Sequence, residues 1–239
     1  MNIIEKIDKQ KLLLTGLLII IGVISRILLH DFFNGIANPW DASGFGVLDV
    51  FFITAVIAII SGVLLGKYYT LIVPIVVMTI TDTYYAFANS TYAGLALYTS
   101  WLFLFTISGY VFIALLGSYL KKKSKLSFTF IPKFMGVGIL GVVIYDLWTN
   151  FGFWLTYSKL GWYPATFGGL ATVYSGGIPF MIWHILSTTI ALSVIAFPLI
   201  YFKEHKILKT DFTLKPFEKY SIACATAVLA ILSIISAII

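Results

Sequence analysis

The feature that most constrains this chain is a series of seven long apolar runs separated by short polar stretches. The runs cover about residues 12–29, 47–66, 68–88, 95–120, 133–157, 176–202 and 219–239. Each run has close to or more than the roughly 20 residues that one crossing of a bilayer requires. Only 11% of the residues are charged, whereas soluble domains carry about 25%. The sequence therefore predicts a multi-pass membrane protein.

Helices are predicted for these runs because lipid offers the backbone no hydrogen-bond partners. Runs such as Val50 to Leu65 also lack the alternation of a membrane β-strand. The first run follows the charged segment Met1 to Lys11 and reaches Arg26 without a small-residue cleavage site, which favours a retained helix over a signal peptide. The single cysteine, Cys224, excludes an internal disulfide. The predicted fold class is an all-α integral membrane protein.

Lysines indicate the orientation in the membrane, because basic residues concentrate in cytoplasmic loops. Fourteen of the 16 basic residues lie before the first run or in alternate connections, and the exceptions are Lys159 and Arg26. The fourteen are Lys6, Lys9, Lys11, Lys67, Lys121, Lys122, Lys123, Lys125, Lys133, Lys203, Lys206, Lys209, Lys215 and Lys219. The pattern predicts a protein of the cell membrane with a cytoplasmic N-terminus and an external C-terminus, with Lys122 inside and Tyr163 outside.

Polar residues within the predicted helices gather toward the outer side. They are Arg26, His30, Asp31, Asp49, Asp82, Asp146, Asn150 and His184. An ionisable group in a spanning helix costs roughly 2.5–3.5 kcal/mol, so it normally faces a partner or a wet cavity. Each residue alone could belong to a structural network, in which Arg26 is expected to pair with an acid, preferably Asp82. For the whole set we predict an outward-facing polar cavity, because one arginine cannot neutralise three acids.

Tryptophans and long loops occur on the same side. All six tryptophans fall in the predicted outer half or outer loops, at Trp40, Trp101, Trp148, Trp154, Trp162 and Trp183. An aromatic belt normally marks both interfaces, so some of these rings are predicted to line a ligand pocket and others to form an outer belt. Two outer segments, residues 30–46 and 157–175, are rich in glycine and proline. We interpret both as loops that cover the pocket.

Several stretches resemble a known class of membrane proteins. The motifs are Ile80-Thr81-Asp82, Asp146 to Gly152, Tyr163-Pro164 with Gly168 to Leu170, and Tyr174 with Gly177 to Phe180. Over about residues 12–202 the chain resembles the S components of energy-coupling factor (ECF) transporters, and more narrowly an uncharacterised family related to them. The resemblance implies a six-helix domain at residues 1–202, followed by an inner loop and an additional helix at residues 203–239. It also implies capture of a vitamin or similar micronutrient, with a transmembrane coupling subunit and ATPases as partners.

Other chemistries find little support in the sequence. A nucleotide-binding Gly-x-x-x-x-Gly-Lys-Ser/Thr motif and a Gly-x-Ser-x-Gly elbow are both missing. His30, Asp31, Asp41 and His184 could bind a divalent metal if the fold brought them together, but they lack helical ligand spacing. The basic residues do not cluster on a soluble face, so nucleic acid is not an expected partner. We predict no catalytic residues, metal or cofactor.

The predicted function is therefore uptake of a small micronutrient by a non-enzymatic, substrate-capturing membrane subunit. The alternatives are an accessory subunit of a larger complex and a membrane-embedded enzyme. The excess of acids favours a neutral or cationic ligand, and the tryptophans favour a planar one. The predicted pocket has a volume of about 300 Å³ or more. Its predicted lining residues are Arg26, Asp82, Asn150, Trp154, Tyr163 and His184.

Overall fold

The fold was determined as a computed structural model that describes residues 9–36, 51–66, 68–88, 102–123, 127–204 and 216–238. These residues are almost entirely helical. The helices are α1 (Lys9–Ile36), α2 (Phe51–Ile60) with its π-helical continuation η2 (Ser61–Leu65), α3 (Tyr69–Ala88), α5 (Leu102–Lys123), α6 (Phe130–Lys159), α7 (Phe167–Glu204) and α8 (Pro216–Ile238). Each of the seven predicted apolar runs thus contains a helix of the described part of the chain.

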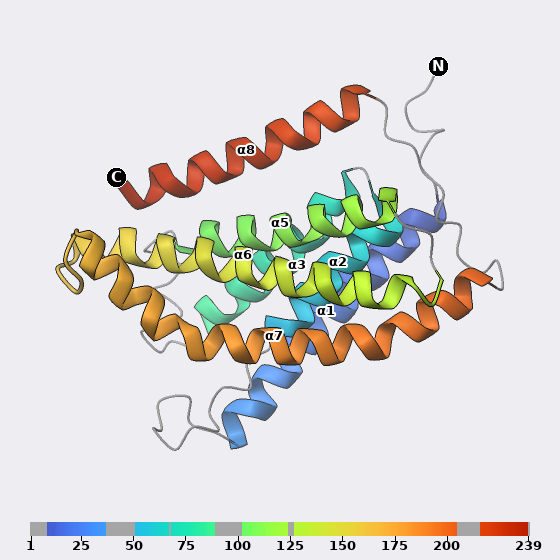
Figure 1. Cartoon of the computed structure of the whole chain (residues 1–239), viewed down its shortest axis with the longest axis horizontal. Helices are drawn as coiled ribbons and strands as arrows, with labels where there is room; N and C mark the ends of the chain where they lie inside the picture. Colours follow the sequence, from blue (N-terminus) through green and yellow to red (C-terminus); the bar gives the residue numbers. More distant parts are fainter. Residues whose placement is uncertain are drawn as a thin grey trace.

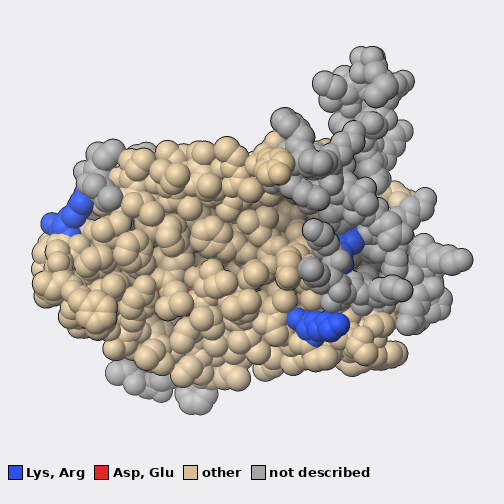
Figure 2. Space-filling model, turned by 45° about the horizontal axis from the view of Figure 1, so that its top comes forward, with Lys and Arg blue, Asp and Glu red and all other residues tan. Residues whose placement is uncertain are grey.

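Five of the helices are long and apolar enough to cross a membrane. They are α1, α5, α6, α7 and α8, whereas α2 with η2 and α3 are shorter apolar helices. On the face shown in Figure 2, the described surface between the two ends is almost free of charged residues, and the blue Lys and Arg atoms lie toward the ends. These observations confirm the prediction of an all-α, multi-pass membrane protein.

Helix α5 is the centre of the bundle, since it contacts α2, η2, α3, α6 and α8. In Figure 1, α8, α5, α6 and α7 lie one below another. At these helix contacts, glycines leave room for the aromatic rings of the facing helix, which gives close packing. A β-carbon at Gly109 would lie 2.6 Å from the ring of Tyr145, and one at Gly152 would lie 2.3 Å from the ring of Phe105.

A very close backbone approach joins the end of α2 and η2 to α5. A β-carbon at Gly62 would lie 2.1 Å from the Ala114 carbonyl oxygen, and one at Gly117 would lie 2.5 Å from the Ile59 carbonyl oxygen. The π-helical turn ends with a hydrogen bond of 3.2 Å from the Gly66 amide to the Ser61 carbonyl. Gly66 has a φ of 66°, a left-handed conformation that favours glycine. This turn therefore ends α2 while holding it against α5.

Helix α8 contacts the bundle mainly through its C-terminal half. Ser233 Oγ donates to the Leu104 carbonyl at 3.0 Å and lies 3.2 Å from Ser108 Oγ. Trp148 Nε1 donates to the same Ser108 hydroxyl at 2.7 Å. Toward the other end of α8, Tyr220 is 75% exposed. The three polar side chains therefore fix α8 to α5 and α6 at one end.

Two predicted loops are shorter than the sequence suggested. Residues 167–175 belong to α7, so the cover predicted at 157–175 is wrong beyond the short connection at 160–166. Helix α1 likewise continues to Ile36, which makes part of the predicted loop at 30–46 helical. The rest of that loop, with Trp40 and Asp41, lies outside the described residues, as do Asp49 and Trp101.

The arrangement of the helices agrees with the alternation of lysine-rich connections. The end of α5, the start of α6 and the end of α7 lie at the same end of the molecule, whereas α8 ends at the opposite one (Figure 1). Helix α6 carries Lys133 near its start and Lys159 at its end. These lysines are about 39 Å apart along the axis at 1.5 Å per residue, which exceeds the roughly 30 Å of a hydrocarbon core.

We expect the lysine-rich end to face the cytoplasm, and cysteine labelling in intact cells tests this orientation. In a Cys224→Ala background, Trp162→Cys should react with an impermeant maleimide because Trp162, beside Tyr163, is 68% exposed at the predicted outer end. Lys122→Cys should react only after the cells are permeabilised. Labelling of position 122 in intact cells, with position 162 protected, would reverse the orientation.

Candidate functional site

An ion pair joins α1 to α3. Arg26 Nη1 lies 2.7 Å from Asp82 Oδ1, and the two side chains are 15% and 20% exposed. The same nitrogen donates to the hydroxyl of Thr81, which in turn donates to the Val77 carbonyl at 2.9 Å. The preferred pairing of Arg26 with Asp82 is thus confirmed. Mutual neutralisation explains how both groups are tolerated within apolar helices.

A second pair joins α6 to α7 and is more deeply buried. His184 Nδ1 lies 2.9 Å from Asp146 Oδ1 and 3.2 Å from Oδ2, and the side chains are 9% and 6% exposed. The argument that one arginine would have to serve all the acids is therefore wrong, because Asp146 has a histidine partner. Among the described residues, four of these polar side chains form two pairs on two different sets of helices.

One helical turn beyond Asp146, Asn150 connects this pair to the facing helix. Its Nδ2 donates to the Asp146 carbonyl at 2.8 Å. Its amide lies against Gly177 of α7, where a β-carbon would be only 2.7 Å from Nδ2. Glycine at 177 is therefore required for α7 to pass this close to the amide of Asn150.

A pocket of about 390 Å³ lies between α6 and α7 beside these groups. Its lining residues are Asp146, Leu147, Asn150, Phe167, Leu170, Ala171, Tyr174, Ser175, Gly177, Ile178 and Met181. Tyr174 crosses between the helices, since its hydroxyl donates to the Leu147 carbonyl at 3.1 Å. The pocket thus has mostly apolar walls and a few polar groups at defined positions, as small-molecule sites do.

The connection between α6 and α7 fixes one end of the pocket. Helix α6 ends at Lys159, Gly161 follows with a φ of 76°, and the Trp162 amide donates back to the Tyr157 carbonyl at 3.1 Å. This left-handed glycine with its backbone bond is a Schellman-type helix end. A β-carbon at Gly169 would lie 2.0 Å from the Pro164 carbonyl oxygen. The start of α7 is therefore packed directly against the turn.

Comparison with known families identifies the group of sequences to which these helices belong. Residues 6–211 match a family described as a family of unknown function, DUF6580. The chain belongs to the DUF6580 family. No curated protein and no solved structure shows a significant match to it. The resemblance to S components of ECF transporters stays a prediction from the sequence motifs.

The matched region of this DUF6580 protein contains both ion pairs and the whole lining of the α6–α7 pocket. Helix α8 starts at Pro216, beyond the matched residues. The family description assigns no activity, so a function has to be inferred from the geometry of the pocket. Among the described residues, no three His, Cys, Asp or Glu side chains are grouped so as to hold a metal ion, and the side chains of His30 and Asp31 lie outside the described set.

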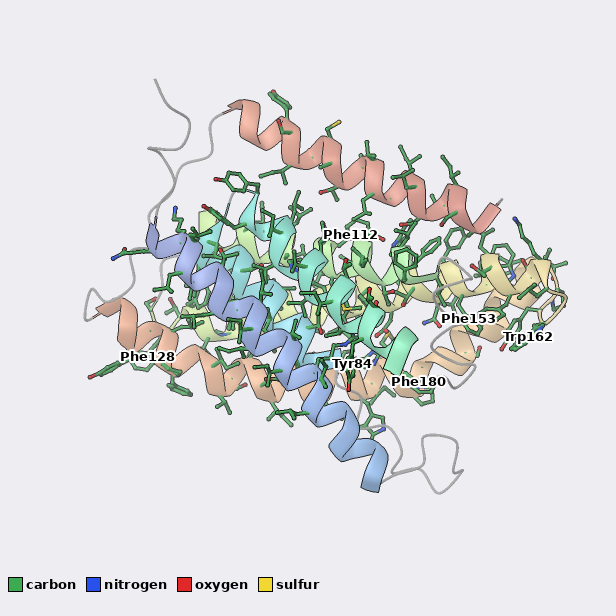
Figure 3. All side chains as sticks on the ribbon, turned by 180° about the vertical axis from the view of Figure 1, so that it is seen from behind. Tyr84, Phe112, Phe128, Phe153, Trp162 and Phe180 are labelled. Carbon is green, nitrogen blue, oxygen red and sulfur yellow. The ribbon has the colours of Figure 1, made fainter. Side chains whose placement is uncertain are left out.

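The six predicted lining residues of the DUF6580 protein occupy different places. Asn150 lines the α6–α7 pocket, whereas Arg26 and Asp82 form their own pair between α1 and α3. His184 is not among the lining residues, but it contacts the lining residue Asp146. Trp154 Nε1 donates to the Pro164 carbonyl at 3.1 Å, and the Tyr163 ring contacts Phe153 edge-on at 5.9 Å. Trp154 and Tyr163 therefore stabilise the connection near Trp162, at the tip labelled in Figure 3.

Five of the eleven lining residues of this DUF6580 pocket were missed because residues 167–175 were expected to be a loop. Once they are helical, Leu170, Ala171, Tyr174, Ile178 and Met181 follow the three- and four-residue spacing of one helix face. That spacing is visible in the sequence. It would have indicated the pocket wall if α7 had been predicted to start at Phe167.

Proposed function

We propose that this protein is a membrane subunit that captures a small solute, such as a vitamin-like micronutrient, in the pocket between α6 and α7. The observation that carries the proposal is the pocket of about 390 Å³ beside the buried Asp146–His184 pair. Its volume falls within the roughly 300–1,000 Å³ of known small-molecule sites. A polar group placed this deep in an apolar bundle commonly marks a substrate path.

Several contacts keep the pocket in shape without a ligand. Tyr174 is tied to the Leu147 carbonyl, and Asn150 is tied to the Asp146 carbonyl. The start of α7 is set by the contact of Gly169 with Pro164. Such preformed walls support binding, because less conformational freedom is lost when the ligand arrives.

The charges beside the pocket support a neutral or cationic solute. Asp146 lines the pocket, and the Arg26 guanidinium is bound to Asp82 on another pair of helices. An anion would therefore approach a carboxylate without help from that arginine. The expectation of a neutral or cationic ligand is kept as part of the proposal.

Binding is favoured over catalysis because the hydroxyl groups in the pocket lining donate their hydrogen bonds to backbone carbonyls. Ser175 Oγ donates to the Ala171 carbonyl at 2.8 Å, and Tyr174 donates to Leu147. A hydrolytic site would instead need a nucleophile that donates to the imidazole or carboxylate. We therefore propose a non-enzymatic subunit that hands its solute to a coupling subunit driven by ATPases, in the cell membrane.

The accessory-subunit alternative is supported by a separate observation. The Arg26–Asp82 pair with Thr81 is a compact interhelical network that does not belong to the α6–α7 pocket. A protein with a purely structural role would need such networks and no bound solute. The two functions therefore make different predictions for the purified protein: solute capture predicts a bound small molecule, and the accessory role predicts none.

We expect the protein purified from its native membranes to carry a small molecule, and Ala171→Phe to remove it. Ala171 lines the pocket, so a phenyl ring at this position fills the space. Native mass spectrometry should show an adduct of constant mass on the wild type and at least a tenfold lower occupancy on the variant.

Thr172→Phe is the matched control, because the exposed Thr172 is the next residue of α7 and is not part of the lining. It should keep the adduct. A wild-type protein without any adduct, or an Ala171→Phe protein with full occupancy, would contradict solute capture in this pocket. The accessory-subunit function would then be preferred.

A further inference from the structure

The α6–α7 pocket is bordered by residues on the outer surface of the membrane-spanning bundle. Leu147 is 49% exposed, Ile178 is 48% exposed and Phe167 is 86% exposed. All three lie within the spanning segments of α6 and α7. In a bilayer, an exposed apolar residue of a spanning helix contacts lipid chains. The border formed by Leu147 and Ile178 therefore gives the pocket a lateral side toward the lipid.

The polar side chains of the lining already direct hydrogens at backbone carbonyls. Asn150 donates to Asp146, Tyr174 donates to Leu147 and Ser175 donates to Ala171. Among the described residues, the Oδ1 of Asn150 has no donor. The Tyr174 oxygen can also still accept a hydrogen bond. A ligand in the pocket therefore meets mainly hydrogen-bond acceptors.

Pro179 leaves one more acceptor beside the pocket. In an α-helix the carbonyl of Ser175 would accept from the amide of residue 179, but proline has no amide hydrogen. Ser175 belongs to the pocket lining. Proline therefore removes one regular intrahelical donor next to the lining residue Ser175, in an environment where backbone acceptors need donors from the protein or a ligand.

The lining also holds an acidic side chain that suits such a ligand. Asp146 contributes a carboxylate to the lining, and its described partner is the imidazole of His184. An ammonium head group would bring both a positive charge and several N–H donors to the acceptor oxygens. The apolar walls formed by Leu170, Ile178 and Met181 suit a hydrocarbon body.

We infer that the ligand is a membrane-dissolved amphiphile with a hydrogen-donating, cationic amine head, which reaches the pocket from the lipid between α6 and α7. The inference rests on the proposed function and specifies its ligand class. The head lies beside Asp146 and Asn150, and the chain lies along the apolar face of α7. No bond is made or broken in this binding step.

The experiment uses the full chain in nanodiscs of phosphatidylcholine and three photoreactive probes with the same twelve-carbon, diazirine-bearing chain. One probe has a primary ammonium head, one a trimethylammonium head and one a carboxylate head. We expect the ammonium probe to label peptides of α6 and the first half of α7. The trimethylammonium probe, which has the charge without N–H donors, should label about tenfold less, since a hydrogen bond to a charged group is worth about one decade or more of affinity.

Two variants at Asn150 separate binding from folding. Asn150→Leu removes the amide oxygen and should reduce labelling by the ammonium probe about tenfold. Asn150→Asp keeps acceptor oxygens at the same position and should retain labelling. Thr172→Val, beside the pocket on the exposed side of α7, is the control that should change nothing. Thermal unfolding of each variant shows whether a loss of labelling reflects a loss of structure.

Equal labelling by the ammonium and trimethylammonium probes would contradict the claim that N–H groups of the ligand donate hydrogen bonds to the pocket. Preferred labelling by the carboxylate probe would overturn the charge. If none of the probes labels the pocket, yet the purified protein carries a solute that Ala171→Phe removes, the capture function stands and the lipid-dissolved amine is excluded. If neither probes nor solute bind, both proposals fail together.

Discussion

Replacing Asp146 by leucine should lower the free energy of unfolding by about 2 kcal/mol. The substitution takes the carboxylate away from His184, whose side chain is only 9% exposed. Removing one member of a buried pair costs about 3–5 kcal/mol in soluble proteins, and polar contacts between membrane helices are weaker. Reversible unfolding in mixed micelles, followed by circular dichroism, measures the loss.

The double variant Asp146→Leu/His184→Leu is the control for this prediction. The single variant leaves the buried imidazole of His184 without its carboxylate partner. The double variant contains neither polar group, so it should recover most of the lost stability. The two single changes are then strongly non-additive, as expected for residues in contact. A double variant that is less stable than Asp146→Leu alone would show that the two side chains stabilise the fold independently.

The second large effect is expected at Gly62. A β-carbon there would lie 2.1 Å from the Ala114 carbonyl oxygen and 2.7 Å from the Ser118 amide nitrogen. Both neighbours are backbone atoms of α5, so Gly62→Ala forces η2 and α5 apart. We expect a destabilisation of about 2–3 kcal/mol, the usual range for overpacking of a core, in the same unfolding assay.

Gly136→Ala provides the matched control in α6, because no atom lies within 4 Å of a β-carbon at that position. Alanine is favoured over glycine in a helix by roughly 0.5–1 kcal/mol, so this variant should be as stable as the wild type or slightly more stable. If Gly62→Ala behaved like Gly136→Ala, the close contact between η2 and α5 would not contribute to the stability of the fold.

The positions of the helices could be predicted from the sequence because the membrane imposes a strong and simple constraint. Runs of about 20 apolar residues with few charges have one stable solution in lipid, and α5 and α6 lie where their runs indicated. The start of α7 could not be predicted in this way. Gly168 and Gly169 are poor helix formers, and the packing of Gly169 against Pro164 explains why glycine is used in the first turn of this helix.

The candidate site was predictable only in part, for a related reason. The pairing of Arg26 with Asp82 follows from the cost of a lone guanidinium in lipid, which leaves few possible partners. The pairing of Asp146 with His184 depends on the register between α6 and α7, which is set by contacts such as Gly138 with Leu192. Such register is a property of packed surfaces and has no local signature in either helix.

Helix α7 is too long to stand upright in a membrane. Its apolar segment, Phe167–Tyr201, has 35 residues and is about 52 Å long at 1.5 Å per residue, whereas a hydrocarbon core is roughly 30 Å thick. The helix must therefore lean or bend, and Pro179 and Pro198 lie within it at positions where helices commonly kink. A leaning helix passes more than one neighbour along its length. This explains how α7 contacts α2 as well as α6, and why it connects parts of the bundle that are far apart in the sequence.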